Sequence, residues 1–257
     1  MMRDARKKEI TEIVFSGGEP TLRKDIVDLV SVAGRMGFKT ISMESNGRMF
    51  CYKDFSQSLL RNGLNSVCIS IHSAHPEIHD LMTRVRGSHR QAMGGLKVLR
   101  SLSPSLSLST RTFVTNLNKK NLETLAPRLL AMDAKLCELR VFRWDDTPVP
   151  DFDKLSPTLA EAGEIVRRFK DKMTSKSSSL RIRGVPLSFL PGSERNSVEF
   201  LALRDSRYNQ AFLRCRADAN GKKKTKVCSF CSMNNCCEGV YAEYLEKRGD
   251  SDMIPSA

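Results

Sequence analysis

A chain of 257 residues is long enough for one sizeable hydrophobic core, or for one core with a small appendage. A hydrophobic content of 40%, a charged content of 28% and a net charge of +13 fit a globular protein, and no apolar run could span a bilayer. Residues 1–10 are polar and basic, which argues against a secretory signal. We therefore expect a cytoplasmic protein whose eight cysteines are metal ligands or buried thiols.

Strand-like runs alternate with helical patterns through the first 145 residues. Strands are predicted at Ile10–Ser16, Lys39–Met43, Ser66–Ile71, Leu106–Val114 and Leu136–Phe142. Helices are predicted around 26–33 and at Phe55–Asn62, Gln91–Leu102 and Leu122–Met132. This alternation predicts an α/β fold with parallel strands and right-handed crossovers. A doubly wound open sheet and a barrel both fit the order, although no G-x-G-x-x-G follows a strand.

The organisation changes after Pro148. A helix is predicted at Glu161–Met173, followed by a strand-like run over Leu180–Leu190. From residue 214 onward the chain is basic, rich in cysteine and too short for a core of its own, and such segments are usually stabilised by metal. We expect three parts: an α/β core at 1–147, a connecting region at 148–213 and a metal-binding tail at 214–250.

Polar residues follow each predicted strand, where ligands of parallel α/β folds gather. The first such cluster is Gly17-Gly18-Glu19-Pro20. Two glycines let the backbone approach a ligand closely, and Pro20 holds Glu19 in extended geometry. An acidic side chain beside exposed carbonyl groups suits the ammonium group of a ligand.

The run from Ile13 to Pro20, with Ser45-Asn46-Gly47 and Ser70-Ile71-His72 after the next two strands, resembles the radical S-adenosylmethionine superfamily. The similarity is to the branch that contains peptide maturases and the molybdenum-cofactor cyclase. It implies a partial or open (β/α)6-type TIM-like barrel that lacks its first strand, with a small cysteine-rich C-terminal extension. It also implies an S-adenosylmethionine site formed by Gly17, Gly18, Glu19 and Pro20, with Ser45, Asn46, Ser70 and Arg84 as candidates for the ribose and carboxylate. For Arg84, a surface ion pair is the alternative.

A second constellation lies in the tail, at Cys228-x2-Cys231-x5-Cys237, with Cys215 as a reasonable fourth ligand. Thiolates at this spacing can reach one metal, and both zinc and a [4Fe–4S] cluster accept four of them. The tail resembles the auxiliary-cluster motif of the same superfamily, which favours the [4Fe–4S] cluster over zinc. That resemblance also selects Cys237 over its neighbour Cys236.

One expected motif is missing. In the superfamily a C-x3-C-x2-C segment upstream of the glycine pair holds the catalytic cluster, yet no cysteine precedes Gly17. We interpret this as truncation or a misplaced start at Met1, and expect the catalytic [4Fe–4S] cluster in a longer chain. The implied activity is reductive cleavage of S-adenosylmethionine to a 5′-deoxyadenosyl radical. It would need an electron donor and an unknown substrate, for which the branch suggests a peptide.

A run of lysines and a group of three histidines can each be interpreted in more than one way. Lysines crowd Lys222–Lys226, which we interpret as a solvated loop, with nucleic-acid binding or compensation of a cluster's negative charge as other readings. His72, His75 and His79 are assigned to a loop that contains Pro76 and holds no metal. The alternatives for the whole chain are a zinc-thiolate module that binds RNA and a degenerate, non-catalytic scaffold.

Overall fold

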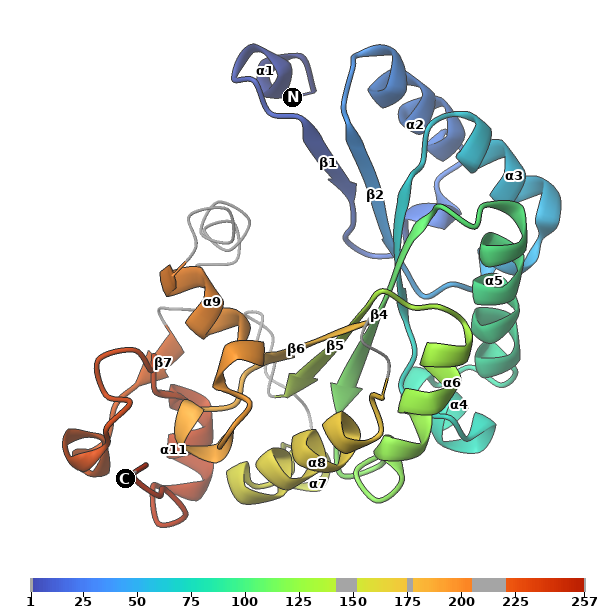
Figure 1. Ribbon diagram of the computed structural model, residues 1–257. Coiled ribbons are helices and arrows are strands. Elements are labelled where there is room, and N and C mark those ends of the chain that lie inside the picture. The colour runs from blue at the N-terminus through green and yellow to red at the C-terminus, as the bar shows by residue number, and fades with distance from the viewer. Residues whose placement is uncertain (1, 142–151, 175–177, 205–220, 257) are drawn as a thin grey trace. The chain divides into compact units, whose positions relative to one another are not determined.

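The computed structural model describes residues 2–141, 152–174, 178–204 and 221–256 (Figure 1). Its internal contacts divide the chain into two compact units. The first comprises Met1–Thr112, Pro127–Cys137 and Ser175–Ser179. The second comprises Phe113–Ala126, Glu138–Thr174 and Leu180–Ala257. Among the described residues, no helix combines the length and apolarity needed to cross a bilayer.

Six strands form the main sheet, and their order in the sheet is their order in the chain. They are β1 (Glu12–Phe15), β2 (Thr40–Ser45), β3 (Ser66–Ser70), β4 (Ser107–Val114), β5 (Leu136–Val141) and β6 (Ser179–Arg183). The pairs β1–β2, β2–β3 and β3–β4 are parallel. The short strands β7 (Lys222–Lys223) and β8 (Val240–Tyr241) pair antiparallel in a second sheet. Each of the five predicted strands is confirmed, with ends shifted by a few residues.

The order of the strands decides between the two architectures that the sequence left open. A doubly wound sheet reverses its strand order at a switch point, whereas a barrel adds each strand beside the previous one. The order β1 to β6 shows no reversal. The predicted α/β fold of the partial-barrel type is therefore confirmed.

The helices alternate with these strands. They are α1 (Met2–Lys7), α2 (Ile26–Arg35), α3 (Lys53–Arg61), α4 (Pro76–Thr83), α5 (Ser88–Leu102), α6 (Leu125–Ala131), α7 (Phe152–Leu155), α8 (Leu159–Asp171), α9 (Val198–Arg204) and α11 (Ala242–Arg248). The 3-10 helices are η1 (Pro20–Leu22), η2 (Met49–Cys51), η3 (Leu122–Thr124), η4 (Leu187–Phe189), η5 (Glu194–Asn196) and η7 (Lys226–Phe230).

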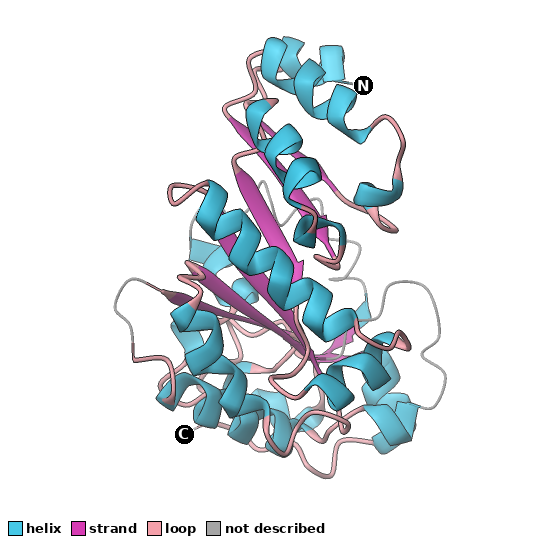
Figure 2. Ribbon diagram, turned by 90° about the vertical axis from the view of Figure 1, so that its right-hand side faces the viewer, coloured by secondary structure: helices cyan, strands magenta, loops and turns pink. Residues whose placement is uncertain are grey.

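The core of the first unit lies between the strands and the helices that cover one of their faces. Figures 1 and 2 show α2, α3 and α5 on the same side of β2 and β3. Met43 of β2 and Ile69 of β3 are completely buried, as are Val30, Leu59 and Leu96 of the three helices. Strand side chains alternate in direction, so the intervening positions point to the opposite face.

Helix α4 is absent from the sequence prediction, which assigned His75 and His79 to a loop because of Pro76. Proline is favoured at the first position of a helix, where its missing N–H has no partner in any case. Pro76 occupies that position, with His75 as the N-cap. The loop assignment was therefore wrong.

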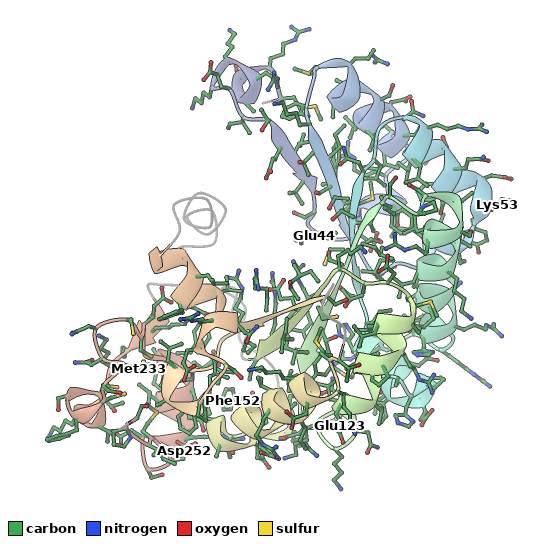
Figure 3. The ribbon with its side chains drawn as sticks, viewed as in Figure 1. Glu44, Lys53, Glu123, Phe152, Met233 and Asp252 are labelled. Atoms are coloured by element: carbon green, nitrogen blue, oxygen red, sulfur yellow. The ribbon has the colours of Figure 1, made fainter. Side chains whose placement is uncertain are left out.

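The second unit includes the cysteine-rich tail. Helix α8 begins with a capping box, in which the side chains of Thr158 and Glu161 each bond the other's backbone N–H. The hydroxyl of Tyr244, a fully buried residue of α11, accepts the backbone N–H of Leu159 at 3.2 Å. It also donates to Asp252, and its ring lies 6.2 Å from that of Phe152. Figure 3 labels Phe152 and Asp252. The end of the tail thus shares a core with α7 and α8.

Candidate functional site

The loop between β1 and η1 exposes backbone without side chains. Gly17 and Gly18 are both exposed and have positive φ angles, +87° and +52°. A Cβ atom at either position would meet no atom within 4 Å, so conformation, not crowding, favours glycine here. The peptide groups of this loop therefore lie open to a ligand.

The carboxylate of Glu19 is held in place by four donors. Its Oε1 accepts the hydroxyl of Ser45 at 2.7 Å, the hydroxyl of Thr21 at 2.6 Å and the backbone N–H of Thr21 at 3.2 Å. Its Oε2 accepts the backbone N–H of Asn46 at 2.7 Å. Glu19 is thus held in one orientation beside the end of β2 and is supported by Thr21, which the sequence analysis missed although Pro20 at the first helical position marks the start of η1.

Hydrogen bonds within the turn after β2 hold Ser45 and Asn46, which bind this carboxylate. The backbone N–H of Gly47 donates to the Ser45 hydroxyl at 3.0 Å, and that of Arg48 donates to Oδ1 of Asn46 at 3.0 Å. A Cβ on Gly47, where φ is +80°, would lie 2.5 Å from Ile69. Ser45 and Oδ1 of Asn46 therefore act first as internal positioning groups. No hydrogen bond within the described residues uses the side-chain amide N–H groups of Asn46, so these groups could donate to a ligand.

Two other predicted residues, Ser70 and Arg84, do not join this cluster. Ser70 ends β3 and follows Ile69, the register partner of Ser45. Arg84 is exposed and closes α4 with a left-handed φ of 56°. Within the described part of the chain, neither makes a hydrogen bond or ion pair with Glu19. Their roles at a ligand remain predictions.

Two histidines, His72 and His79, contact each other in the segment after Ser70. The backbone N–H of His72 donates to Nδ1 of His79 at 3.1 Å, and the two rings stack with centroids 5.4 Å apart. Burial, with His79 as a second cause, lowers the pKa of His72 to about 3. Burial, with His89 as a second cause, lowers the pKa of His79 to about 4. Both rings are therefore uncharged near neutral pH. Their hydrogen bond and ring contact connect the segment after β3 to α4.

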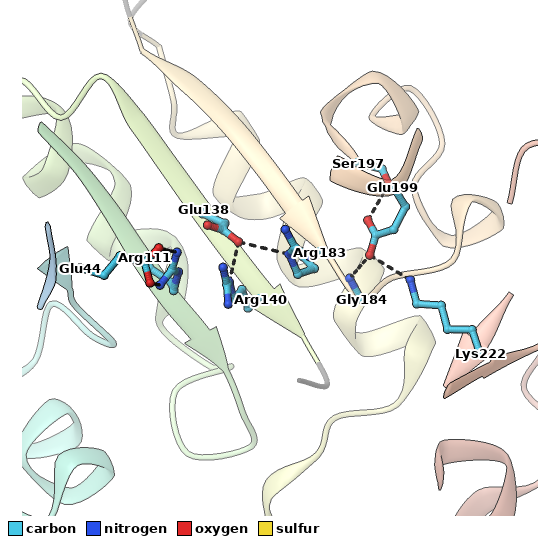
Figure 4. Close-up of polar contacts among 9 residues, drawn as sticks. All are labelled: Glu44, Arg111, Glu138, Arg140, Arg183, Gly184, Ser197, Glu199 and Lys222. Carbon is cyan, nitrogen blue, oxygen red and sulfur yellow. Dashed lines mark hydrogen bonds and ion pairs between the residues drawn. The ribbon is translucent and has the colours of Figure 1, made fainter. Parts of the chain in front are cut away.

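A bidentate ion pair connects two strands of the first unit. Arg111 of β4 donates to both carboxylate oxygens of Glu44 on β2, at 2.8 and 2.7 Å (Figure 4). The Arg111 side chain is 11% exposed, so its charge is largely removed from water. Each charge interrupts a strand of otherwise uncharged residues, a signal from which buried charges, though not their pairing with one another, could have been predicted.

The second unit contains two further buried charge clusters (Figure 4). On β5, Glu138 accepts Nε of Arg140 at 2.5 Å, and Nε of Arg183 on β6 lies 3.5 Å from it. In the second cluster, Glu199 of α9 accepts hydrogen bonds from the backbone N–H of Gly184 at 2.9 Å and from Nζ of Lys222 at 3.0 Å. These side chains are 13% exposed or less.

The prediction of a solvated lysine loop is wrong for Lys222, whereas Lys223, Lys224 and Lys226 are exposed. The Lys222 side chain is 6% exposed and forms ion pairs of 3.0 Å with both Glu199 and Glu238. Burial, the largest single cause, would lower the pKa of Lys222, but Glu199, Tyr241 and Glu238 together outweigh burial and raise it. Its Nζ also lies 4.9 Å from the centroid of the Tyr241 ring. The charge of Lys222 is thus neutralised inside the protein, and it is not presented to a nucleic acid.

Three of the four predicted tail ligands line one small pocket. Cys228, Cys231 and Cys237 face it together with apolar side chains, while Cys215 lies outside the described residues. Cys236 instead lines a neighbouring pocket and donates its thiol to the carbonyl of Met233 at 3.4 Å.

Backbone donors already point at two of these sulfur atoms. The N–H of Ser256 lies 3.3 Å from Sγ of Cys231, and that of Gly239 lies 3.4 Å from Sγ of Cys237. Hydrogen bonds to sulfur are typical of thiolates that hold iron–sulfur clusters. Within the described part of the chain, however, no three Cys, His, Asp or Glu side chains converge closely enough to bind a single metal ion. Burial raises the pKa of the Cys237 thiol.

Comparison with protein families finds a match to the Radical SAM superfamily over residues 1–127. Residues of this chain are 36% identical over 90 positions to a probable GTP 3′,8-cyclase of Saccharolobus solfataricus, covering 35% of this chain and 29% of the relative. A probable GTP 3′,8-cyclase of Sulfolobus acidocaldarius is 38% identical over 76 residues, covering 30% and 24%. The alignments thus span less than a third of the length of these curated relatives.

Solved structures share the fold at low sequence identity. Streptococcus suis SuiB superposes with a TM-score of 0.57 and 15% identity, over 70% of this chain and 40% of SuiB. A structure titled anSMEcpe with bound AdoMet gives 0.53 and 14%, over 66% of this chain and 49% of that one. A domain of pyruvate-formate lyase-activating enzyme from Bacteroides vulgatus gives 0.50 and 17%, over 66% and 97%. These neighbours support the partial-barrel architecture.

Proposed function

The chain belongs to the radical SAM superfamily, and from that membership we propose that it binds S-adenosylmethionine with the loop between β1 and η1. The superfamily uses this cofactor together with a [4Fe–4S] cluster to supply a 5′-deoxyadenosyl radical that abstracts hydrogen from a substrate. The activity of the whole protein is proposed to be of this class.

The observation that carries this proposal is the preorganised carboxylate of Glu19 beside bare backbone. Oε1 already accepts three hydrogen bonds, whereas Oε2 accepts one from Asn46. A carboxylate oxygen has about two acceptor directions, so Oε2 retains capacity for a cationic donor. The ammonium group of the cofactor's methionine part is such a donor. Because Glu19 is fixed in advance, little conformational freedom is lost on binding.

The residues of this chain do not fit the catalytic cluster. A cluster of this kind is held by cysteine thiolates, and the C-x3-C-x2-C motif is not among the 257 residues. Cys51, Cys68 and Cys137 of the first unit do not form a metal-binding group in the described part of the chain. The proposal for this chain is therefore confined to binding and orienting the cofactor.

Replacement of Glu19 by glutamine tests this site. We expect Glu19→Gln to weaken S-adenosylmethionine binding, measured by isothermal titration calorimetry, by at least about tenfold, since a charge-assisted hydrogen bond contributes about 1.5–3 kcal/mol. Glu12→Gln is the matched control, because Glu12 is exposed on β1 and loses the same charge. Equal affinities of both variants and the unmodified chain would contradict the proposal. Absence of binding to the unmodified chain would favour the degenerate scaffold.

The tail is proposed to hold an auxiliary [4Fe–4S] cluster through Cys228, Cys231 and Cys237, with Cys215 as the fourth ligand. The shared pocket and the two N–H donors to sulfur support this assignment. When bound, such a cluster would supply an electron acceptor or a substrate anchor.

Metal analysis of two neighbouring cysteine variants tests the tail. After anaerobic reconstitution we expect about four iron and four sulfide per chain. Cys237→Ser should remove most of both, whereas Cys236→Ser should retain them because Cys236 faces a different pocket. Stoichiometric zinc without sulfide would instead establish the zinc alternative.

A peptide is the proposed substrate class, and an electron donor the proposed partner. One structural neighbour is SuiB bound to its precursor peptide SuiA, with a TM-score of 0.55. This neighbour supports a peptide as the first class to screen. The curated relatives, named as probable GTP 3′,8-cyclases, match about a third of this chain.

A further inference from the structure

Helices α5 and α6 of the first unit border a groove that plays no part in the proposed cofactor site. Its volume is about 1190 Å³, larger than the roughly 300–1,000 Å³ of ordinary small-molecule pockets. Four cationic side chains line it: Arg86, Arg90, Lys97 and Arg128. We call this feature the α5–α6 groove.

Among the residues that the structure describes, these four cations have no carboxylate partner. All four residues are exposed, and within the described part of the chain no carboxylate forms an ion pair with any of them. Arg111, Arg140 and Lys222, by contrast, are each paired with a glutamate. The groove therefore concentrates positive charge without neutralising it.

Asp80, the sole carboxylate among the residues that line the groove, is already engaged. It accepts the backbone N–H groups of Gly87 at 2.5 Å and His89 at 2.8 Å, and the hydroxyl of Ser88 at 2.9 Å. These bonds cap the start of α5, so Asp80 contributes to the helix end and not to pairing with the basic side chains. His89 also lines the groove, and its buried Nε2 has no hydrogen-bond partner in the described residues.

The other lining residues are small or apolar. Met93 and Gly94 of α5 and Ala131 of α6 line the groove between the basic side chains, and Met132 follows α6. Methionine is flexible and polarisable, and it adapts to varied aliphatic partners. No Phe, Tyr or Trp side chain lines the groove, so bases of a nucleic acid would not find the usual stacking platform.

From this combination we propose that the α5–α6 groove docks an acidic segment of a protein partner, with aliphatic side chains against Met93 and Met132 and carboxylates against the arginines. A groove lined by both basic and apolar side chains matches the recognition of an amphipathic peptide. The surface goes beyond the proposed cofactor site and does not depend on it.

Fluorescence anisotropy with a defined probe tests the groove. The probe is a labelled peptide of about fourteen residues, with glutamates and with leucines at helical spacing. We expect saturable binding that weakens with added salt, and at least about tenfold weaker binding by Arg90→Glu/Arg128→Glu. Lys24→Glu/Arg61→Glu is the matched control, because it reverses two exposed charges outside the groove. Replacing the leucines by serine should also weaken binding several-fold.

Several outcomes would overturn this proposal. One is equal affinity of the groove variant and its control for the peptide. Another is an unchanged affinity when the peptide's leucines are replaced by serine. The third is tighter binding of a single-stranded DNA oligonucleotide than of the peptide. If the charge-reversed variant unfolds, judged by circular dichroism, Arg90→Gln/Arg128→Gln gives the same comparison with a smaller electrostatic change. S-adenosylmethionine titration of each variant separates the two proposals, since loss of groove binding should leave cofactor affinity within about twofold.

Discussion

Replacing Lys222 by methionine is expected to destabilise the protein by about 3–5 kcal/mol, because breaking a buried ion pair leaves uncompensated charge. The Lys222 side chain is 6% exposed, and its removal leaves the carboxylates of Glu199 and Glu238 without their shared cation. The free energy of unfolding, from urea denaturation, is the measurement. Lys223→Met on the same strand is the control, since Lys223 is exposed and should change stability by about 0.5 kcal/mol or less.

A double variant separates lost charge compensation from lost packing. Glu199→Gln keeps an acceptor for the backbone N–H of Gly184 but removes one of the two charges that Lys222 neutralises. Adding Glu199→Gln to Lys222→Met should therefore recover part of the lost stability. Equal stability of the Lys222→Met and Lys223→Met variants would contradict the buried arrangement of β7.

Gly184→Ala is expected to be at least as damaging. A Cβ on Gly184 would lie 1.7 Å from the carbonyl oxygen of Val141, far inside contact distance, and φ there is +87°. Left-handed geometry costs a residue with a side chain about 1–2 kcal/mol, and overpacking adds about 1–3 kcal/mol. We expect a loss of about 3 kcal/mol or more, or failure to fold, measured by thermal and denaturant unfolding.

Gly192→Ala measures how much stability is lost through the positive φ angle alone, without a steric clash. Gly192 also has a positive φ, +70°, but a Cβ there would meet nothing within 4 Å. This variant should lose about 1 kcal/mol, from conformation alone. Similar losses in the two variants would show that the contact between Gly184 and Val141 is looser than described.

The strands and the first glycine turn could be predicted because their signals are local. Apolar β-type runs ended by Gly17-Gly18 or Gly47 identify both a strand and the turn after it. Helix α4 was missed because Pro76 was treated as a helix breaker, although proline is equally suited to the first helical position.

The charge clusters could not be predicted because their partners lie far apart in the sequence. Glu44 and Arg111 are separated by 67 residues, and Lys222 and Glu199 by 23. Composition alone made the lysine run resemble a solvated loop. Pairing of β7 with β8 instead brings Lys222 over the ring of Tyr241 and between two glutamates. Similarly, the sequence did not show that the hydroxyl of Ser45, a predicted ligand contact, donates to Glu19.

A crystal structure of this chain with S-adenosylmethionine would test the central claim most directly. The account predicts that the ammonium group of the methionine part lies against Oε2 of Glu19, with the backbone of Gly17 and Gly18 alongside. A cofactor bound elsewhere on the chain, or a Glu19 carboxylate turned away from it, would contradict the account.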